Sequence, residues 1–155
     1  MKTKKISSNV KPSKKKTHPF WSFFWLSFLV VSLWYVWYSF YEPSNEIKWV
    51  NVSNQESLIN NSNKYAIVFF TAEWCSPCRI MKREVFADQK VEEMINSKYR
   101  AIMIDIDNPE TKDIVNQYKA YATPTTLLID PNGKVIEHIV GKIEKDKFLQ
   151  MLLNI

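Results

Sequence analysis

The sequence predicts an α/β fold: a mixed central sheet with helices on both faces, preceded by one N-terminal transmembrane helix. Two short apolar runs rich in β-branched residues, 65–71 and 101–107, are typical of buried strands. Segments with helical periodicity alternate with these runs, as in a sheet packed between helices. An uncharged apolar run from Phe20 to Tyr41 predicts the membrane helix. The length of 155 residues leaves room for one ordinary domain besides that helix.

The net charge of +5 is concentrated at the start of the chain. Seven lysines and no acid precede Phe20, whereas residues 42–155 carry 14 Lys and Arg against 16 Asp and Glu, a balance of −2. The predicted domain is therefore slightly acidic, and it has no basic stripe interleaved with aromatic residues. We expect no nucleic-acid binding, because such binding needs positive charge on the folded surface.

Residues 20–41 are long enough to cross a membrane, because a helix of 22 residues spans about 33 Å against a hydrocarbon core of about 30 Å. The run is longer than the apolar region of a cleaved signal peptide, and no small-x-small cleavage site follows it. It also lacks the polar face of an ordinary core helix. We therefore predict an uncleaved anchor in contact with membrane lipid. The one-sided lysines place the basic tail, residues 1–19, in the cytoplasm and the chain beyond Glu42 on the other side.

The first half of the domain follows from local patterns, taken in chain order. The short polar segment 42–46 is interpreted as the linker between anchor and domain. A strand is expected at residues 47–52 and a helix around residues 56–60. The continuous apolar run "YAIVFFT", residues 65–71, predicts a buried central strand that leads directly into the two cysteines.

Helices are expected on either side of the next strand. Apolar residues at spacings of three and four predict helices at Cys75–Phe86 and Gln89–Ser97. The run "AIMIDID", residues 101–107, is a second buried strand. The segment "PETKDIVNQY", residues 109–118, is expected to be helical, since proline and an acid both suit a first helical turn.

The end of the chain predicts a hairpin and a final helix. Residues 124–130 and 134–140 have strand character, and the turn "PNG" joins them. Residues 145–153 form an amphipathic pattern that closes the domain. The resulting order β-α-β-α-β-α-β-β-α is the basis of the mixed sheet predicted above.

The stretch "TAEWCSPCR" holds both cysteines of the chain, Cys75 and Cys78. A structural disulfide between them would close too short a loop to stabilise much. A zinc site needs about four ligands, and the chain has two cysteines and two histidines. A copper site of the two cysteines with His138 stays open, although an ordinary half-buried imidazole in an alternating strand is the simpler interpretation of His138. Redox chemistry of the pair is favoured.

The spacing of the cysteines suits thiol–disulfide exchange. A strand that runs into "WCSPC" and then into a helix puts Cys75 at the helix N-terminus, where free backbone N–H groups and the helix dipole favour a thiolate. Cys75 is therefore the expected nucleophile. Cys78, one turn later, can attack the mixed disulfide that Cys75 forms. Pro77 fits a first helical turn, which requires no N–H from it.

Three segments together resemble the thioredoxin superfamily: "FFTAEWCSPCR", "YATPTTLLID" and "NGKVIEHIVGKI". The resemblance covers residues 47–155, and both glycines of the chain, Gly133 and Gly141, fall where the family places glycine. It implies a thioredoxin fold with a redox-active disulfide, no other cofactor, and supporting roles around the cysteines for Trp74, Ser76 and Pro77. It also implies that Thr123 and Pro124 form the cis-proline element that pairs with an extended substrate segment. The stretch "EVFADQKVEEMI" is most similar to the C-terminal domain of DsbD-type thiol:disulfide interchange proteins.

Two positions depart from the family pattern. Phe69 stands where the family usually has a buried Asp beneath the disulfide, and Met103 stands in place of a partnering Lys. The usual proton relay is then absent. The sequence leaves three candidates for the group that deprotonates Cys78: Glu73, Glu84 or a water. Glu73 beside Trp74 is more simply explained as a solvated loop residue.

The dipeptide Ser76–Pro77 between the cysteines indicates the direction of electron flow. It has no histidine to stabilise the thiolate further, and proline at its second position resembles the reducing members of the superfamily. We expect a reductase of oxidised proteins, recharged by a transmembrane electron donor of the DsbD or CcdA type. The implied location is a bacterial inner membrane with the domain in the periplasm. The alternative functions are a disulfide oxidase or isomerase, or a tethered copper carrier that uses the same cysteines.

Overall fold

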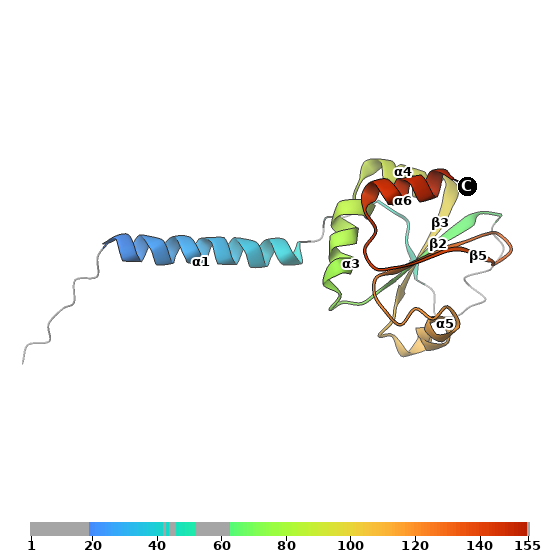
Figure 1. Cartoon of the computed structure of the whole chain (residues 1–155), viewed down its shortest axis with the longest axis horizontal. Coiled ribbons are helices and arrows are strands. Elements are labelled where there is room, and N and C mark those ends of the chain that lie inside the picture. The colour runs from blue at the N-terminus through green and yellow to red at the C-terminus, as the bar shows by residue number, and fades with distance from the viewer. Residues whose placement is uncertain (1–18, 42, 44–45, 52–62, 155) are drawn as a thin grey trace, which may run out of the picture. The chain divides into compact units, whose positions relative to one another are not determined.

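The computed structural model describes residues 19–41, 43, 46–51 and 63–154 (Figure 1). The chain divides into two compact units, Met1–Tyr41 and Glu42–Ile155, and each is described by itself. The predicted helix around residues 56–60 and most of the predicted linker, residues 42–46, lie outside the described residues.

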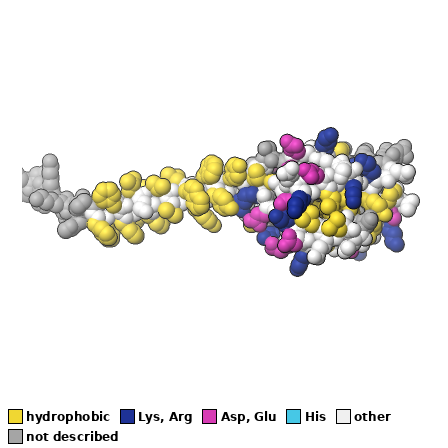
Figure 2. Space-filling model, turned by 90° about the horizontal axis from the view of Figure 1, so that it is seen from above, with side chains coloured by type: hydrophobic (Ala, Val, Ile, Leu, Met, Phe, Trp, Pro, Cys, Tyr) yellow, Lys and Arg dark blue, Asp and Glu magenta, His cyan; other side chains and the backbone are white. Residues whose placement is uncertain are grey.

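The first unit holds helix α1, Pro19–Phe40, which has no charged residue. Apolar side chains surround it, and most of them are more than half exposed (Figure 2). Residues Phe20–Phe40 are long and apolar enough to cross a membrane, judged by length and composition only.

The second unit is built on a five-stranded mixed sheet with the order β1-β3-β2-β4-β5. The strands are β1 Val50–Asn51, β2 Tyr65–Thr71, β3 Tyr99–Asp105, β4 Thr125–Ile129 and β5 Val135–Val140. β1 and β2 run parallel to β3, whereas β4 is antiparallel to β2 and β5 to β4. The mixed sheet expected from the element order is confirmed.

Helices cover both faces of this sheet (Figure 1). One face is covered by α3, Ser76–Met81, which continues into the π-helical turn η1, Lys82–Phe86, and by α4, Gln89–Lys98, and α6, Lys145–Leu153. The other carries the 3-10 turn η2, Pro109–Thr111, and helix α5, Lys112–Gln117. These elements confirm the helices expected after residue 75.

Alternate residues of β2 enter two separate apolar layers, as the two-residue period of a strand requires. Ile67 and Phe69 belong to the layer that includes both cysteines, which we call the cysteine layer. Val68 and Phe70 belong to the layer beneath α5. The continuous apolar run at residues 65–71 thus serves two faces at once.

One expected strand is shorter than predicted. Residues 47–52 were expected to be extended throughout, but within the described residues pairing with β3 is limited to Val50 and Asn51. The preceding residue Ile47 is buried in the cysteine layer instead of pairing. Glu46 is held by α4, because its N–H donates to Glu92 Oε1 at 3.0 Å and its carbonyl accepts from Asn96 Nδ2 at 3.0 Å.

An ion pair links the start of α4 to the start of α6. Asp88 is the N-cap of α4, where its Oδ1 accepts from the N–H of Lys90 at 3.1 Å. Its Oδ2 accepts from Lys145 Nζ at 2.9 Å. The hydrogen bond from Lys145 holds the pKa of Asp88 below its ordinary value.

Candidate active site

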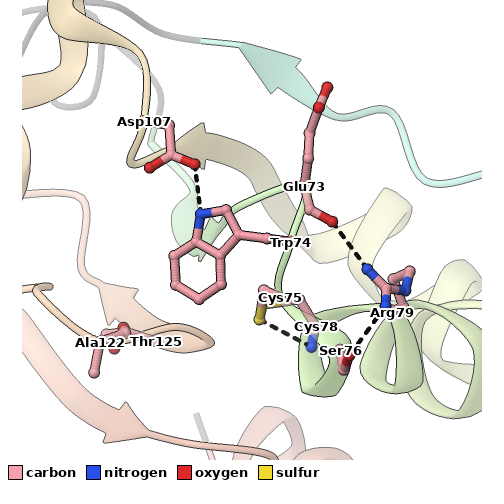
Figure 3. The surroundings of a disulfide bond; sticks show 9 residues. All are labelled: Glu73, Trp74, Cys75, Ser76, Cys78, Arg79, Asp107, Ala122 and Thr125. Carbon is pink, nitrogen blue, oxygen red and sulfur yellow. Dashed lines mark hydrogen bonds between the residues drawn. A yellow bond between two sulfur atoms is a disulfide. The ribbon is translucent and has the colours of Figure 1, made fainter.

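The two cysteines lie at the point where β2 passes into α3 (Figure 3). They form a disulfide with a Cα–Cα distance of 5.3 Å. Cys75 is the N-cap residue of α3, and its Sγ accepts a hydrogen bond from the N–H of Cys78 at 3.2 Å. Both side chains are 1% exposed. The geometry expected from the sequence is therefore present: one sulfur lies at the helix N-terminus, and the other lies one turn into the helix.

The residues around Cys75 are tied together by one guanidinium group. Arg79 donates from Nη1 to the carbonyl oxygen of Glu73 at 2.9 Å and from Nη2 to Ser76 Oγ at 3.0 Å (Figure 3). Pro77 occupies the first turn of α3, as expected. The sequence reasoning did not identify Arg79 as part of the site, although it directly follows Cys78 in the same helix, α3.

Trp74 presents an exposed indole beside the disulfide. Its side chain is 65% exposed, and Nε1 donates to Asp107 Oδ2 at 2.7 Å (Figure 3). Asp107 was expected to end the second buried strand, but β3 ends at Asp105 and Asp107 lies in the following turn. The sequence reasoning missed this contact, because its two partners are 33 residues apart.

Phe69 fills the position where the family usually has an acid. It is completely buried in the cysteine layer, and its ring centroid lies 4.9 Å from that of Phe86 and 6.2 Å from that of Trp49. Its Cα partner on β3 is Met103, as the departures from the family pattern imply. Aromatic packing thus occupies the place of a carboxylate with its lysine partner.

Neither acid suggested as a base for Cys78 lies in the buried layer. The Glu73 side chain is exposed and lines a cleft of about 540 Å³ at the carboxyl ends of β1, β2 and β3. Glu84 is an exposed residue of η1 that forms ion pairs with Lys142 at 3.5 Å and with Arg83 at 3.7 Å. Their surface positions favour solvation over proton abstraction from a buried thiol.

The loop before β4 contains the cis peptide bond that the family resemblance implies, between Thr123 and Pro124. The carbonyl of Pro124 accepts from the N–H of Gly141 at 2.7 Å, which ties this loop to the end of β5. Gly141 has φ +100°, a conformation that a side chain would strain. Thr125 Oγ1 donates to the carbonyl of Ala122 at 2.7 Å.

His138 is exposed, not half-buried as expected, and it lies on β5, an edge strand most of whose side chains are exposed. Its Cα partner is Leu127 on β4. Among the described residues, no group of three or more His, Cys, Asp or Glu side chains could hold a metal ion.

The sheet order, the disulfide at the start of α3 and the cis-proline loop together define a thioredoxin-fold protein. The family described as "Thioredoxin-like domain" matches residues 52–155, so the chain belongs to that family. Its fold and its paired cysteines make it a thiol:disulfide oxidoreductase in the general sense.

Similar proteins include both thioredoxins and interchange proteins. The thiol:disulfide interchange protein DsbD of Pseudomonas fluorescens is 29% identical over 91 residues, 56% of this chain but only 15% of that protein. Thioredoxin H2-2 of Oryza sativa subsp. japonica is 31% identical over 97 residues, 61% of this chain and 67% of that protein. The chain therefore corresponds to a small part of the DsbD and to two thirds of the plant thioredoxin.

Solved structures show the same fold. A thioredoxin from Thermus thermophilus superimposes with a TM-score of 0.61 at 21% identity, covering 70% of this chain and 85% of that one. The oxidised C-terminal domain of Neisseria meningitidis DsbD does so with a TM-score of 0.52 at 22% identity, covering 59% and 79%. At these identities the likeness is one of fold.

Proposed function

We propose that this protein is a membrane-anchored disulfide reductase that acts through Cys75 and Cys78 outside the cytoplasm. The observation that carries the proposal is the position of Cys75 at the N-cap of α3, where its sulfur already accepts an N–H hydrogen bond from Cys78. An N–H donor and the positive end of the helix dipole stabilise a thiolate more than a thiol. Cys75 is therefore the nucleophile.

The exchange proceeds in two balanced steps. The Cys75 thiolate attacks one sulfur of a substrate disulfide, so that a Cys75–substrate bond forms and the other substrate sulfur leaves with the electron pair. Cys78 then loses its proton and attacks Cys75, which forms the Cys75–Cys78 disulfide and releases the second substrate sulfur as a thiolate. The substrate is reduced by two electrons and the protein is oxidised by two.

The cis-proline loop is the proposed substrate contact. An extended substrate segment pairs with the backbone at Thr123 and Pro124, while the exposed indole of Trp74 packs against it. The hydrogen bond between Pro124 and Gly141 supports this function, because it holds the loop in place before substrate arrives.

Reduction is favoured over oxidation by the residues between the cysteines. Ser76 and Pro77 contribute no imidazole to the thiolate, and the Ser76 hydroxyl oxygen already accepts from Arg79. A less stabilised thiolate makes the dithiol a better electron donor. The midpoint potential of the full chain in detergent, equilibrated with glutathione or dithiothreitol buffers, tests this. We expect a potential close to that of thioredoxin, about −270 mV. A potential of about −120 mV, as in a strongly oxidising member of the superfamily, would identify an oxidase instead.

Helix α1 is the proposed anchor, with the lysine-rich tail in the cytoplasm and the domain in the periplasm of a bacterial inner membrane. An electron donor of the DsbD or CcdA type then recharges Cys75–Cys78 through the membrane. Protease added to spheroplasts should digest the domain. Digestion only after the membrane is opened would reverse this topology.

The clients can be found by trapping. Cys78→Ser should leave Cys75 joined to its substrates as mixed disulfides in a membrane preparation, because the resolving thiol is absent. Cys75→Ser is the matched control and should trap none. The copper alternative makes a different prediction, which is tight Cu(I) binding with negligible reductase turnover.

A further inference from the structure

Apart from tyrosines, the polar residues that are buried in the described part of the domain are all threonines, and they differ in whether their hydroxyls are hydrogen-bonded. Within residues 46–51 and 63–154, the buried polar side chains are Thr71, Thr111, Thr125 and Thr126, and no charged side chain is buried. Thr111 and Thr125 have backbone partners for their hydroxyls. The hydroxyls of Thr71 and Thr126 are buried without a hydrogen-bond partner, and so is the hydroxyl of the partly exposed residue Thr123. Such a group costs free energy and calls for a functional explanation.

Thr126 lies on the same sheet face as the cysteines. It is 1% exposed and is the direct cross-strand partner of Phe69. Directly opposite residues of an antiparallel pair point to one face. Leu128, two residues further along β4, belongs to the cysteine layer, whereas Leu127 belongs to the opposite layer. The Thr126 hydroxyl is therefore placed beside the aromatic ring that occupies the usual position of the acid.

We propose that Thr126 serves the resolving step, its hydroxyl donating a hydrogen bond to the Cys78 thiolate in the reduced protein and in the mixed disulfide. In the oxidised protein both sulfurs are in the disulfide, and the Thr126 hydroxyl has no hydrogen-bond partner. When the Cys75–Cys78 bond opens, Cys78 loses its proton to water and the thiolate accepts from Thr126. Because the hydroxyl donates and does not take the proton, it stabilises the nucleophile without being its base.

Among the described residues, no acidic side chain is buried in the cysteine layer. The ionisable residues on the elements around the cysteine layer are exposed or partly exposed, and the Arg83 side chain is only 15% exposed. They are Glu73, Arg79, Lys82, Arg83, Glu84, Asp88, Lys90, Glu92, Glu93, Lys98, Arg100, Asp105, Asp107, Glu137, His138, Lys142, Glu144, Lys145, Asp146 and Lys147. Tyr99 is buried in the layer, but its hydroxyl donates to the carbonyl of Leu152 at 2.6 Å, and burial raises its pKa. A hydroxyl on the sheet is thus a neutral donor available to a buried thiolate.

The test is the pKa of Cys78 in the full chain in detergent micelles. Because the chain has only two cysteines, Cys75→Ala leaves Cys78 as the only thiol, whose titration is followed by the 13C shift of its Cβ. In this background Thr126→Val, which keeps the side-chain shape, should raise the pKa of Cys78 by about one pH unit. Thr126→Ser, which keeps the hydroxyl, should stay within about 0.3 unit of the parent.

Thr125→Val is the matched control, the same change one residue along β4. Its hydroxyl lies on the face of the other layer, so the pKa of Cys78 should not move. An unchanged pKa in Thr126→Val, an equal rise in Thr125→Val, or a rise in Thr71→Val alone would each overturn the assignment to Thr126.

Kinetics add a second readout, with Cys75 restored. Release of substrate from a preformed Cys75 mixed disulfide should be about threefold slower at pH 7 in Thr126→Val, because about tenfold less thiolate is partly offset by its greater nucleophilicity. The kinetic prediction rests on the resolving role proposed for Cys78. The titration does not rest on that role, because it measures only the effect of Thr126 on the pKa of Cys78. A raised pKa in a protein without reductase turnover would thus count against the proposed function and leave the contact of Thr126 with Cys78 standing.

Discussion

The solvent side and the sheet side of the disulfide differ in how their polar groups are satisfied. On the solvent side, the indole of Trp74 and the guanidinium of Arg79 have partners within 3.0 Å. On the sheet side, Phe69 fills the space and two threonine hydroxyls have no partner. Charge therefore lies where water solvates it, and the interior carries only neutral groups, as the cost of burying an ion requires. The difference means that the two cysteines, although equally buried, meet different electrostatic surroundings once reduced.

The largest effect should come from replacing the proposed nucleophile, Cys75. Cys75→Ser should abolish disulfide reduction by the full chain in detergent with dithiothreitol, because a serine hydroxyl is not ionised at neutral pH. Insulin reduction or a chromogenic disulfide measures it. Activity retained by Cys75→Ser would show that Cys78 is the nucleophile.

Phe69→Asp should erase the difference between the two sides by placing an acid on the sheet side. We expect faster release from a Cys75 mixed disulfide at neutral pH, since the acid can accept the Cys78 proton, and a stability loss of several kcal/mol if the acid ionises there. Single-turnover release against pH and urea unfolding measure the two effects.

Phe69→Leu is the control for that experiment, because it loses aromatic packing without adding an acid. It should be less stable but should resolve no faster than the natural protein. If the natural protein already resolves as fast as Phe69→Asp with the same pH dependence, another base serves Cys78.

A smaller effect is expected on the solvent side. Asp107→Ala removes the acceptor of the Trp74 indole, which water can replace, so the free energy of unfolding should fall by about 1 kcal/mol or less. The Trp74 indole N–H should exchange with solvent faster. Glu110→Ala, an exposed acid of the same region, should leave that exchange unchanged.

The smallest effect should lie away from the disulfide and should depend on pH. The folded-state pKa of Asp88 is lowered by Lys145, so this ion pair stabilises the protein above the ordinary Asp value of 3.8, and the stabilisation is lost as pH falls through the folded-state pKa. Asp88→Asn keeps a good N-cap residue but loses the ion pair. The free energy of unfolding of this variant should be slightly lower than that of the natural protein at pH 7. The two values should become equal in acid, below the folded-state pKa of Asp88. A gap that persists in acid would assign the effect to the cap instead.

Much of the fold could be predicted from local sequence. The apolar run 65–71 coincides with β2, and the helical periodicities after Cys75 match α3, η1 and α4, because side-chain period follows directly from backbone geometry. Strand ends were less predictable, since pairing partners decide them. Within residues 47–51, which the structure describes, the expected strand at 47–52 pairs only at Val50 and Asn51, and the one at 101–107 ends at Asp105.

What the sequence by itself determined is the chemistry that depends on neighbours along the chain. Cys75 and Cys78 are three residues apart, and a strand followed by a helix puts one of them at the N-cap. Only the tertiary structure decided which residues surround them. The register between β2 and β4 places Thr126 opposite Phe69, and the turn after β3 brings Asp107 to Trp74. Such contacts depend on how distant strands align across the sheet, and a shift of one residue would have turned Thr126 to the other face.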